Sequence, residues 1–254
     1  MRRLLIFVLL VTCWTSWQAY GQEITADQII TKVNDLMNQK SMVATVRMTI
    51  VTSSGKTRTF EYESWSKDSG EKNLMRYTTP ARVKGQAILM LNNADDIWAY
   101  FPRTQRTRKL ATHAKKQQME DSDFTYEDMG SGNAFITDFI AKRLQDDKMQ
   151  DYDCYRIELT KKPDIDSHYS RLIMYIIKSN FVPVVIDYYD ENDPSLWLKR
   201  LVQSDILTID DIPTAMKMVM QNQQDRTETS MELADVKYNV ELDDAMFTER
   251  GLKE

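Results

Sequence analysis

Hydrophobic alternation with a period of two runs through most of this chain and constrains its fold more than any other feature. Every second position from Met42 to Ile50 is apolar, and a similar pattern returns after the Ser-Ser-Gly turn at 53–55. Successive side chains of a strand point to opposite faces of a sheet, so this pattern predicts strands with one buried face. The chain has only 7 glycines and 6 prolines, which favours long strands joined by polar turns.

Strand-like segments recur to the end of the chain. Further strands are expected at 57–65, 73–78, 86–91, 97–101, 152–160, 170–178, 182–189, 196–207, 214–221 and 226–241. Short turns join most of these segments, and strands joined in this way pair antiparallel. The sequence therefore predicts one large antiparallel sheet.

Helices are few. Residues 25–37 carry apolar side chains at helical spacing, and Thr25 with Gln28 forms a capping-box pattern at their start. A second helix is expected at 136–144 and a helical turn at 244–248. A large sheet must curl and cover its apolar face, and these helices are the available cover. We predict a mainly β chain of the α+β class, a large curved antiparallel sheet with helices lying across its concave side. Such a lid need not fill the space beneath it, so a cavity is expected there.

The first residues match a secretory signal peptide. Two arginines precede an apolar run at 4–11, and a small-residue cleavage pattern follows at 19–21. The run is shorter than the roughly 20 apolar residues that a membrane-spanning helix needs. We expect a signal peptide at 1–21, a single domain at 22–254 and export to the periplasm. A retained anchor and lipidation of Cys13 are the alternatives.

Charge and reactive residues argue against several classes of function. Without residues 1–21, which hold two arginines and no acid, the charge is 31 − 38 = −7, so nucleic-acid binding is not expected. Cys154 is the single cysteine after residue 21, so no intramolecular disulfide is expected. His113 and His168 lack metal-ligand spacing. We expect no enzymatic activity, no metal and no cofactor.

Methionine is abundant, with 15 residues, and several lie on strand faces. Its flexible side chain suits either ordinary core packing or a cavity for acyl chains. The aromatic residues at 98–101 likewise suit either a strand end packed in the core or a partly solvated rim. The cavity residues that we expect are Met48, Ile50, Phe60, Tyr62, Met75, Tyr77, Leu89, Trp98, Tyr100, Met174, Ile176, Met216, Met218, Met220 and Met231.

A basic stretch at 103–116 precedes an acidic one at 120–128. In a strand at 106–109, Arg106 and Arg108 lie on one face and Lys109 on the other. Positive charge on both faces suits an exposed edge strand. Four interpretations remain open: a solvated hairpin face, contact with anionic head groups, docking to an acidic patch of a partner protein, and internal pairing with the acidic stretch. The expected partner or head-group contacts are Arg103, Arg106, Arg108 and Lys109.

Several motifs resemble the outer-membrane lipoprotein carrier family, the LolA-like proteins. They are Lys72–Tyr77 (KNLMRY) and Asp95–Pro102 (DDIWAYFP). The chain looks closest to the branch of outer-membrane lipoprotein-sorting proteins, in which a basic strand precedes a Phe-Thr-Tyr-Glu-Asp segment, here within Asp123–Asp128. The ending Phe247–Leu252 is similar to the closing turn of the family. The resemblance covers nearly all of 22–254.

This resemblance implies a half-open β-barrel with a helical lid over a hydrophobic cavity. It also implies a monomeric periplasmic carrier. Its cargo would be a lipid or the acyl chains of a lipoprotein, and its partners an inner-membrane exporter of the resistance-nodulation-division (RND) type, an outer-membrane acceptor, or both. The alternative is an envelope sensor or adaptor that binds a protein without transporting cargo. Lipoprotein carriers hold the lid closed with a cavity arginine, and the nearest position here is Lys72, which lacks the planar fork of donors.

Overall fold

One 14-stranded antiparallel sheet organises the chain. The computed structural model describes residues 23–254, so the signal peptide expected at 1–21 lies outside the described residues. The strand order is β6-β5-β4-β3-β2-β1-β14-β13-β12-β11-β10-β9-β7, and β8 pairs with β9. Because β1 pairs with both β2 and β14, the first and last strands of the chain meet inside the sheet.

The strands agree closely with the alternating segments of the sequence. They are β1 (Ser41–Val51), β2 (Thr57–Lys67), β3 (Lys72–Thr79), β4 (Ala87–Leu91), β5 (Asp96–Phe101), β6 (Arg106–Lys109), β7 (Phe139–Arg143), β8 (Asp147–Met149), β9 (Tyr152–Lys161), β10 (Tyr169–Ile177), β11 (Pro183–Asp190), β12 (Trp197–Ile209), β13 (Ile212–Asn222) and β14 (Thr227–Tyr238). The helices are α1 (Ala26–Met37), α2 (Tyr126–Gly130) and α3 (Ala134–Thr137), with 3₁₀ turns η1 (Thr112–Lys116), η2 (Met119–Asp121), η3 (Asp244–Phe247) and η4 (Gly251–Lys253).

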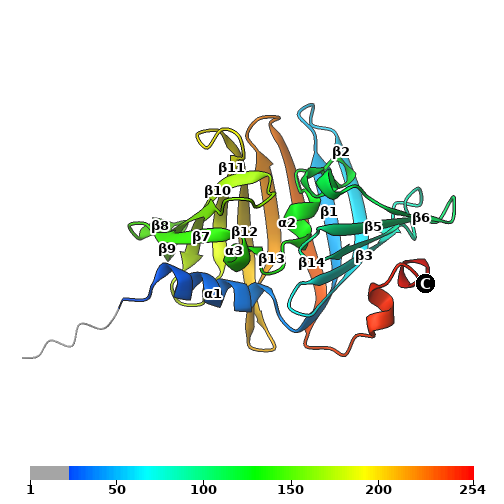
Figure 1. The fold of residues 1–254 in the computed structure, drawn as a ribbon, viewed down its shortest axis with the longest axis horizontal. Coiled ribbons are helices and arrows are strands. Elements are labelled where there is room, and N and C mark those ends of the chain that lie inside the picture. The colour runs from blue at the N-terminus through cyan, green and yellow to red at the C-terminus, as the bar shows by residue number, and fades with distance from the viewer. Residues whose placement is uncertain (1–22) are drawn as a thin grey trace, which may run out of the picture.

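The sheet is strongly curved but not closed. β6 and β7 stand at opposite ends of the strand order and do not pair with each other. The helices α2 and α3 lie across the concave face, and α1 lies along one end of the sheet (Figure 1). The predicted class, a half-open β-barrel with a helical lid, is therefore confirmed. Within residues 23–254, no helix is both long and apolar enough to cross a membrane.

Helix α1 begins with the capping box that the sequence predicts. The Gln28 N–H donates to Thr25 Oγ1 at 3.2 Å, and the Thr25 N–H donates to Gln28 Oε1 at 3.0 Å. These bonds satisfy two of the backbone donors left free at a helix start. Ile29, Ile30 and Val33 are buried, so the apolar face of α1 packs on the core.

The helix predicted at 136–144 is wrong over most of its length. Helix α3 ends at Thr137, and Phe139–Arg143 forms strand β7 against β9. Phe139 is buried whereas Ile140 is 56 % exposed, which is the alternation of an edge strand. The apolar spacing allowed a helix, but pairing with the open edge of β9 satisfies the backbone groups of both strands.

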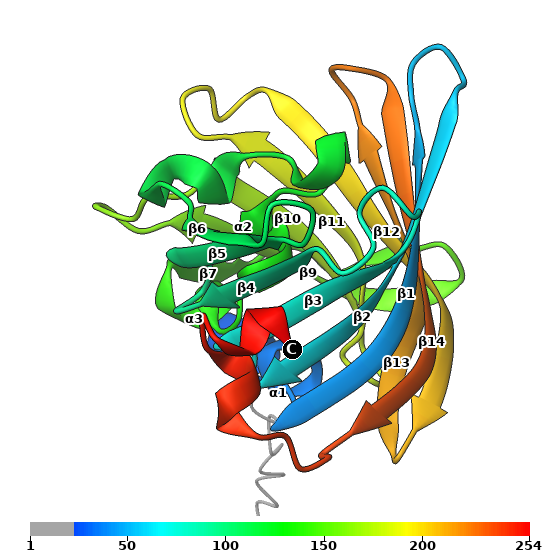
Figure 2. The same ribbon diagram turned by 90° about the vertical axis from the view of Figure 1, so that its right-hand side faces the viewer.

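The two faces of the sheet carry separate cores. On the concave face, buried side chains of the strands pack against the lid residues Met119 and Phe124. On the opposite face, Leu74 of β3 packs with Phe247 and Leu252 of the C-terminal segment. Figure 2 shows this segment crossing β3 and β4 on the outside of the sheet. The concave face is thus the one that a lid covers.

Candidate functional site

A cavity lies between the concave face and the lid. Its volume is about 280 Å³, just below the roughly 300–1,000 Å³ common for ligand pockets. The apolar lining comes mainly from the lid and from β10–β14, with further residues from α1, β1 and β7. It includes Phe124, Met129, Phe135, Leu172, Ile186, Leu201, Met218, Met220 and Leu233. Such a lining can hold hydrocarbon, because burial of apolar surface supplies the free energy of binding.

The lid is the segment 112–137, which contains η1, η2, α2 and α3. Helix α2 has its own capping box: the Asp128 N–H donates to Thr125 Oγ1 at 3.2 Å, and the Thr125 N–H donates to Asp128 Oδ2 at 2.7 Å. A helix of 5 residues is too short to be stable alone. Contacts with the sheet must therefore hold the lid in place.

A buried ion pair joins the lid to the sheet. Lys199 Nζ of β12 lies 2.5 Å from Asp128 Oδ2, and it also donates to the backbone oxygen of Asp123 at 3.0 Å. The Tyr169 hydroxyl donates to Asp128 Oδ1 at 2.7 Å, and the Lys199 ammonium lies over the Tyr169 and Tyr188 rings. The side chains of Lys199 and Asp128 are only 6 % and 3 % exposed. We term Lys199, Asp128 and Tyr169 the lid latch.

Two more carboxylates of the lid accept hydrogen bonds from the rest of the fold. Asp123 Oδ2 accepts a hydrogen bond from the Thr229 hydroxyl of β14 at 2.7 Å. Glu127 accepts hydrogen bonds from the Ser167 hydroxyl and, at 2.9 Å, from the His168 N–H. Burial raises the pKa of Glu127. These carboxylates thus contact strands and loops of the sheet, and not the basic stretch that precedes them in sequence.

A glycine brings the lid close to the turns at one end of the sheet. Gly132 has a φ of +46°, and a Cβ at this position would collide with Asn93 and lie 3.0 Å from Gly70 O. Asn38, at the end of α1, donates from Nδ2 to Gly132 O at 2.7 Å. Any larger residue at 132 would therefore push the lid away from α1 and the neighbouring turns.

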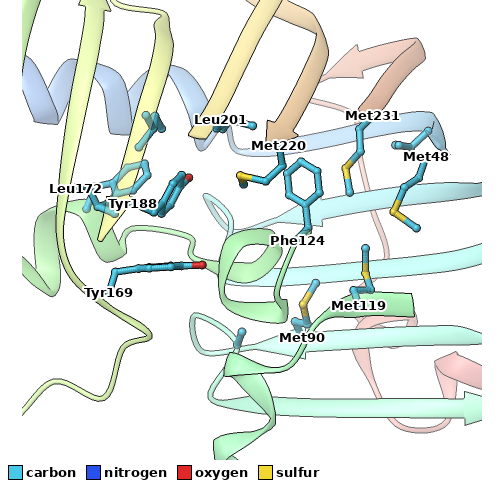
Figure 3. Packing of buried hydrophobic residues seen from close by; sticks show 14 of the residues in the cluster. Met48, Met90, Met119, Phe124, Tyr169, Leu172, Tyr188, Leu201, Met220 and Met231 are labelled. Atoms are coloured by element: carbon cyan, nitrogen blue, oxygen red, sulfur yellow. The ribbon is translucent and has the colours of Figure 1, made fainter. Parts of the chain in front are cut away.

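Most of the expected cavity residues lie in the concave core or pack against it. They are Met48, Ile50, Phe60, Tyr62, Met75, Tyr77, Met174, Ile176, Met218, Met220 and Met231. Of these, Met218 and Met220 line the cavity. Figure 3 shows Met119, Met220 and Met231 around the Phe124 ring, where the lid meets the sheet. Much of the concave face is therefore filled by its own side chains and by the lid.

The remaining expected cavity residues lie elsewhere. Leu89, Trp98 and Tyr100 belong to the cluster beneath the C-terminal segment. Leu89 and Trp98 are cross-strand partners and share one face, whereas Met90, the next residue on β4, faces the lid. Met216 is partly buried and lies outside the three core clusters of the described residues. The register of β4 and β5 decides the positions of Leu89 and Trp98.

Lys72 contacts the C-terminal segment. Its Nζ lies 2.6 Å from Asp68 Oδ2 and 2.9 Å from Asp244 Oδ1. Lys67 Nζ also lies 2.9 Å from Asp244 Oδ1, and hydrogen bonds from these two lysines lower the pKa of Asp244 to about 2. The buried cation that contacts the lid is instead Lys199, from the other half of the sheet. Arg58 of β2 also pairs with the lid, at the exposed Asp121.

The basic contact residues lie on the edge strand β6 and in the turn before it. Arg103, Arg106 and Arg108 are exposed, and within residues 23–254 none of the three forms an ion pair. Lys109 pairs with Asp96, and its ammonium lies over the Trp98 ring. The structure thus presents three guanidinium groups without an anionic partner at an open sheet edge, and that of Arg108 lies over the Phe101 ring.

Lys199 and Tyr169, which contact Asp128 of the lid, were not among the residues predicted from the sequence. The available signal was a single lysine at an inward position of β12, because Lys199, Leu201 and Gln203 share one strand face. A lysine on an apolar face requires an internal partner. Within the part of the chain that the structure describes, no cluster of His, Cys, Asp and Glu is arranged to hold a metal.

Comparison with known proteins agrees with this architecture. A family model with the description "Uncharacterized protein" matches residues 69–254. The chain belongs to this family. No curated protein matches the chain significantly.

Solved structures at 23–24 % identity show the same fold. A DUF1329 family protein from Desulfovibrio piger has a TM-score of 0.81 at 24 % identity, covering 89 % of this chain and 97 % of its own. A domain from Vibrio parahaemolyticus, provisionally described as an outer-membrane lipoprotein-sorting protein, has a TM-score of 0.82 at 23 % identity, covering 90 % and 98 %. A LolA superfamily protein from Nitrosomonas europaea has a TM-score of 0.74 at 23 % identity, covering 89 % and 98 %. The chain has the LolA-like fold that its sequence resemblance implies.

Proposed function

We propose that this protein is a periplasmic carrier that binds a lipid, or the acyl chains of a lipoprotein, and delivers it across the envelope. The observation that carries the proposal is an apolar cavity closed by a lid that a buried ion pair holds to the sheet. Burial of hydrocarbon supplies the affinity, and the polar latch contacts are reversible. The role is transport without catalysis.

Opening of the lid is part of this proposal. The closed cavity of about 280 Å³ is small for a ligand with several acyl chains. A larger ligand must displace the lid and separate Lys199 from Asp128, at the cost of the buried ion pair between them. Cargo binding must offset this cost, so an empty carrier rests closed.

Docking is the second part of the proposal. We place the contact with a partner or with head groups at the basic strand β6, where Arg103, Arg106 and Arg108 carry free charge. On a chain with a net charge of −7 after residue 21, this local excess of cations would attract an acidic surface and speed encounter. An inner-membrane exporter of the RND type or an outer-membrane acceptor would present that surface.

The test is recovery of cargo from native material. The protein is expressed with its own leader in a diderm bacterium, purified without detergent, and extracted for lipid mass spectrometry. We expect a defined lipid or lipopeptide in stoichiometric amount. Repeated recovery of protein free of any lipid would overturn the carrier function.

A further inference from the structure

The cavity lining contains no positively charged side chain. Among the described residues, no lysine, arginine or histidine lines the cavity, whereas Glu127 and Asp128 do. Lys199 is already paired with Asp128. A carboxylate or phosphate head group inside the cavity would therefore meet acidic groups and find no free cation.

One end of the cavity carries a row of uncharged polar side chains. Asn73 of β3 pairs with Ser66 of β2. Across β1, Met42 pairs with Ser66 on one side and with Tyr238 of β14 on the other. The hydroxyl oxygens of Tyr238 and Thr214 are 2.9 Å apart, which extends the row to β13. All these side chains line the cavity, and we term Asn73, Ser66, Tyr238 and Thr214 the polar row.

Three hydroxyls, one in this row and two near it, are free to bind a ligand. Ser64 and Ser66 share the inward face of β2, and Ser131 follows α2 in the lid. Within residues 23–254, none of these three side chains makes a hydrogen bond to protein. Partly buried hydroxyls usually have a partner, in the protein or in the solvent and ligands that occupy the site. These hydroxyls therefore suit a polar group of a bound molecule.

Apart from Glu127, Asp128 and a few uncharged polar groups, the remainder of the cavity lining is apolar. Phe124 closes it from the lid, and Leu172, Ile186, Leu201 and Met220 line it from the sheet. The two parts together match an amphiphile, with hydrocarbon against the apolar side chains and a polar head at the row. The volume of about 280 Å³ favours a single chain over several in the closed form.

We propose that the ligand of this cavity is an amphiphile with an acyl chain and an uncharged, hydroxyl-bearing head that lies on the polar row. This inference rests on the proposed carrier function and specifies its cargo. A glycerol-type head can exchange hydrogen bonds with Ser64 and Ser66. A carboxylate or phosphate would lose its hydration without gaining a counter-charge.

Three amphiphiles with the same oleoyl chain test the proposal. The delipidated exported protein is titrated calorimetrically with 1-monooleoylglycerol, oleate and oleoyl-lysophosphatidylglycerol. We expect monooleoylglycerol to bind at least about tenfold more tightly than either anion. Equal or tighter binding of an anion would overturn the inference and leave the carrier function standing. Binding of none of the three would overturn both.

Substitutions at the polar row give an independent check. Ser66→Lys places a cation there and is expected to strengthen oleate binding about tenfold, whereas Ser53→Lys, in the exposed β1–β2 turn, should leave it unchanged. The milder variant Ser64→Ala/Ser66→Ala keeps the cavity uncharged and should weaken monooleoylglycerol binding about fivefold. Unchanged binding in the alanine variant would show that the head lies elsewhere and would contradict the proposal.

Discussion

Lys199 Nζ lies 2.5 Å from Asp128 Oδ2, although the two residues are 71 positions apart in the chain. One belongs to strand β12 and the other to helix α2 of the lid. Each charge removes most of the cost of burying the other, and Tyr169 satisfies the second oxygen of Asp128. The pair is therefore the buried ionic contact among several that hold the lid on the sheet.

Loss of the lysine should destabilise the protein strongly. Lys199→Met leaves Asp128 buried without its cation, and we expect the free energy of unfolding in urea to fall by about 3–5 kcal/mol. The double variant Lys199→Met/Asp128→Asn should recover much of that loss, because no uncompensated charge remains and the amide oxygen can still accept a hydrogen bond. Lys217→Met, which removes an exposed ion pair with Glu232, should cost less than about 1 kcal/mol. Equal losses in Lys199→Met and Lys217→Met would show that the latch is not a buried pair in solution.

Filling the cavity should exclude cargo. Leu201→Trp adds a larger ring to the lining and should abolish co-purification of lipid, at a stability cost of about 1–3 kcal/mol from overpacking. Leu207→Trp is the matched control, because Leu207 lies on the same strand and is 56 % exposed. Lipid mass spectrometry and thermal unfolding of both variants measure the two effects. Undiminished lipid in Leu201→Trp would place the cargo outside this cavity.

Glu127 should make stability depend on pH. Burial raises its pKa above the usual value of 4.5, so the folded state favours the protonated form. The stability that this protonation contributes is fully present below pH 4.5 and is lost as the pH rises through the folded-state pKa. Glu127→Gln should flatten this part of the profile of unfolding free energy against pH, whereas Glu249→Gln, at an exposed site, should not. Parallel profiles for wild type and Glu127→Gln would refute the assignment.

The C-terminal segment should loosen at low pH. Asp244 has its pKa lowered to about 2 by hydrogen bonds from Lys67 and Lys72, so its contribution is present above the usual 3.8 and is lost as the pH falls through about 2. At neutral pH, Asp244→Asn should speed hydrogen exchange in residues 240–254 and leave the lid unchanged. Asp235→Asn, an exposed substitution on β14, serves as the control. Unaltered exchange in Asp244→Asn would mean that Phe247 and Leu252 alone anchor the segment.

Charge reversal at β6 should separate docking from cargo binding. The variant Arg106→Glu/Arg108→Glu is expected to lose binding to an acidic partner or to anionic vesicles, and to retain the lipid content of the wild type. Lys56→Glu/Lys237→Glu changes the net charge equally at other exposed positions. Partner pull-down, vesicle sedimentation and lipid extraction measure these outcomes. If the control lost binding equally, net charge and not strand β6 would govern docking.

Local sequence patterns were sufficient to predict most of the strands and the first helix. Alternation located the long strands to within a few residues, and Thr25 with Gln28 marked the start of α1. These features depend on neighbours in sequence, so they can be read without knowledge of the fold. The segment Phe139–Arg143 is different, because its spacing allows a helix and only the open edge of β9 makes it a strand.

The sequence by itself determined the antiparallel β class, the first helix and a Met-rich apolar face, because each follows from local periodicity or capping. Tertiary structure decided which face became the cavity, since the register of β4 and β5 places Leu89 and Trp98 beneath the C-terminal segment. It also decided that Lys199, and not Lys72, holds the lid. The partner of a buried charge depends on which distant strands the curved sheet brings together. Local sequence patterns do not determine such contacts.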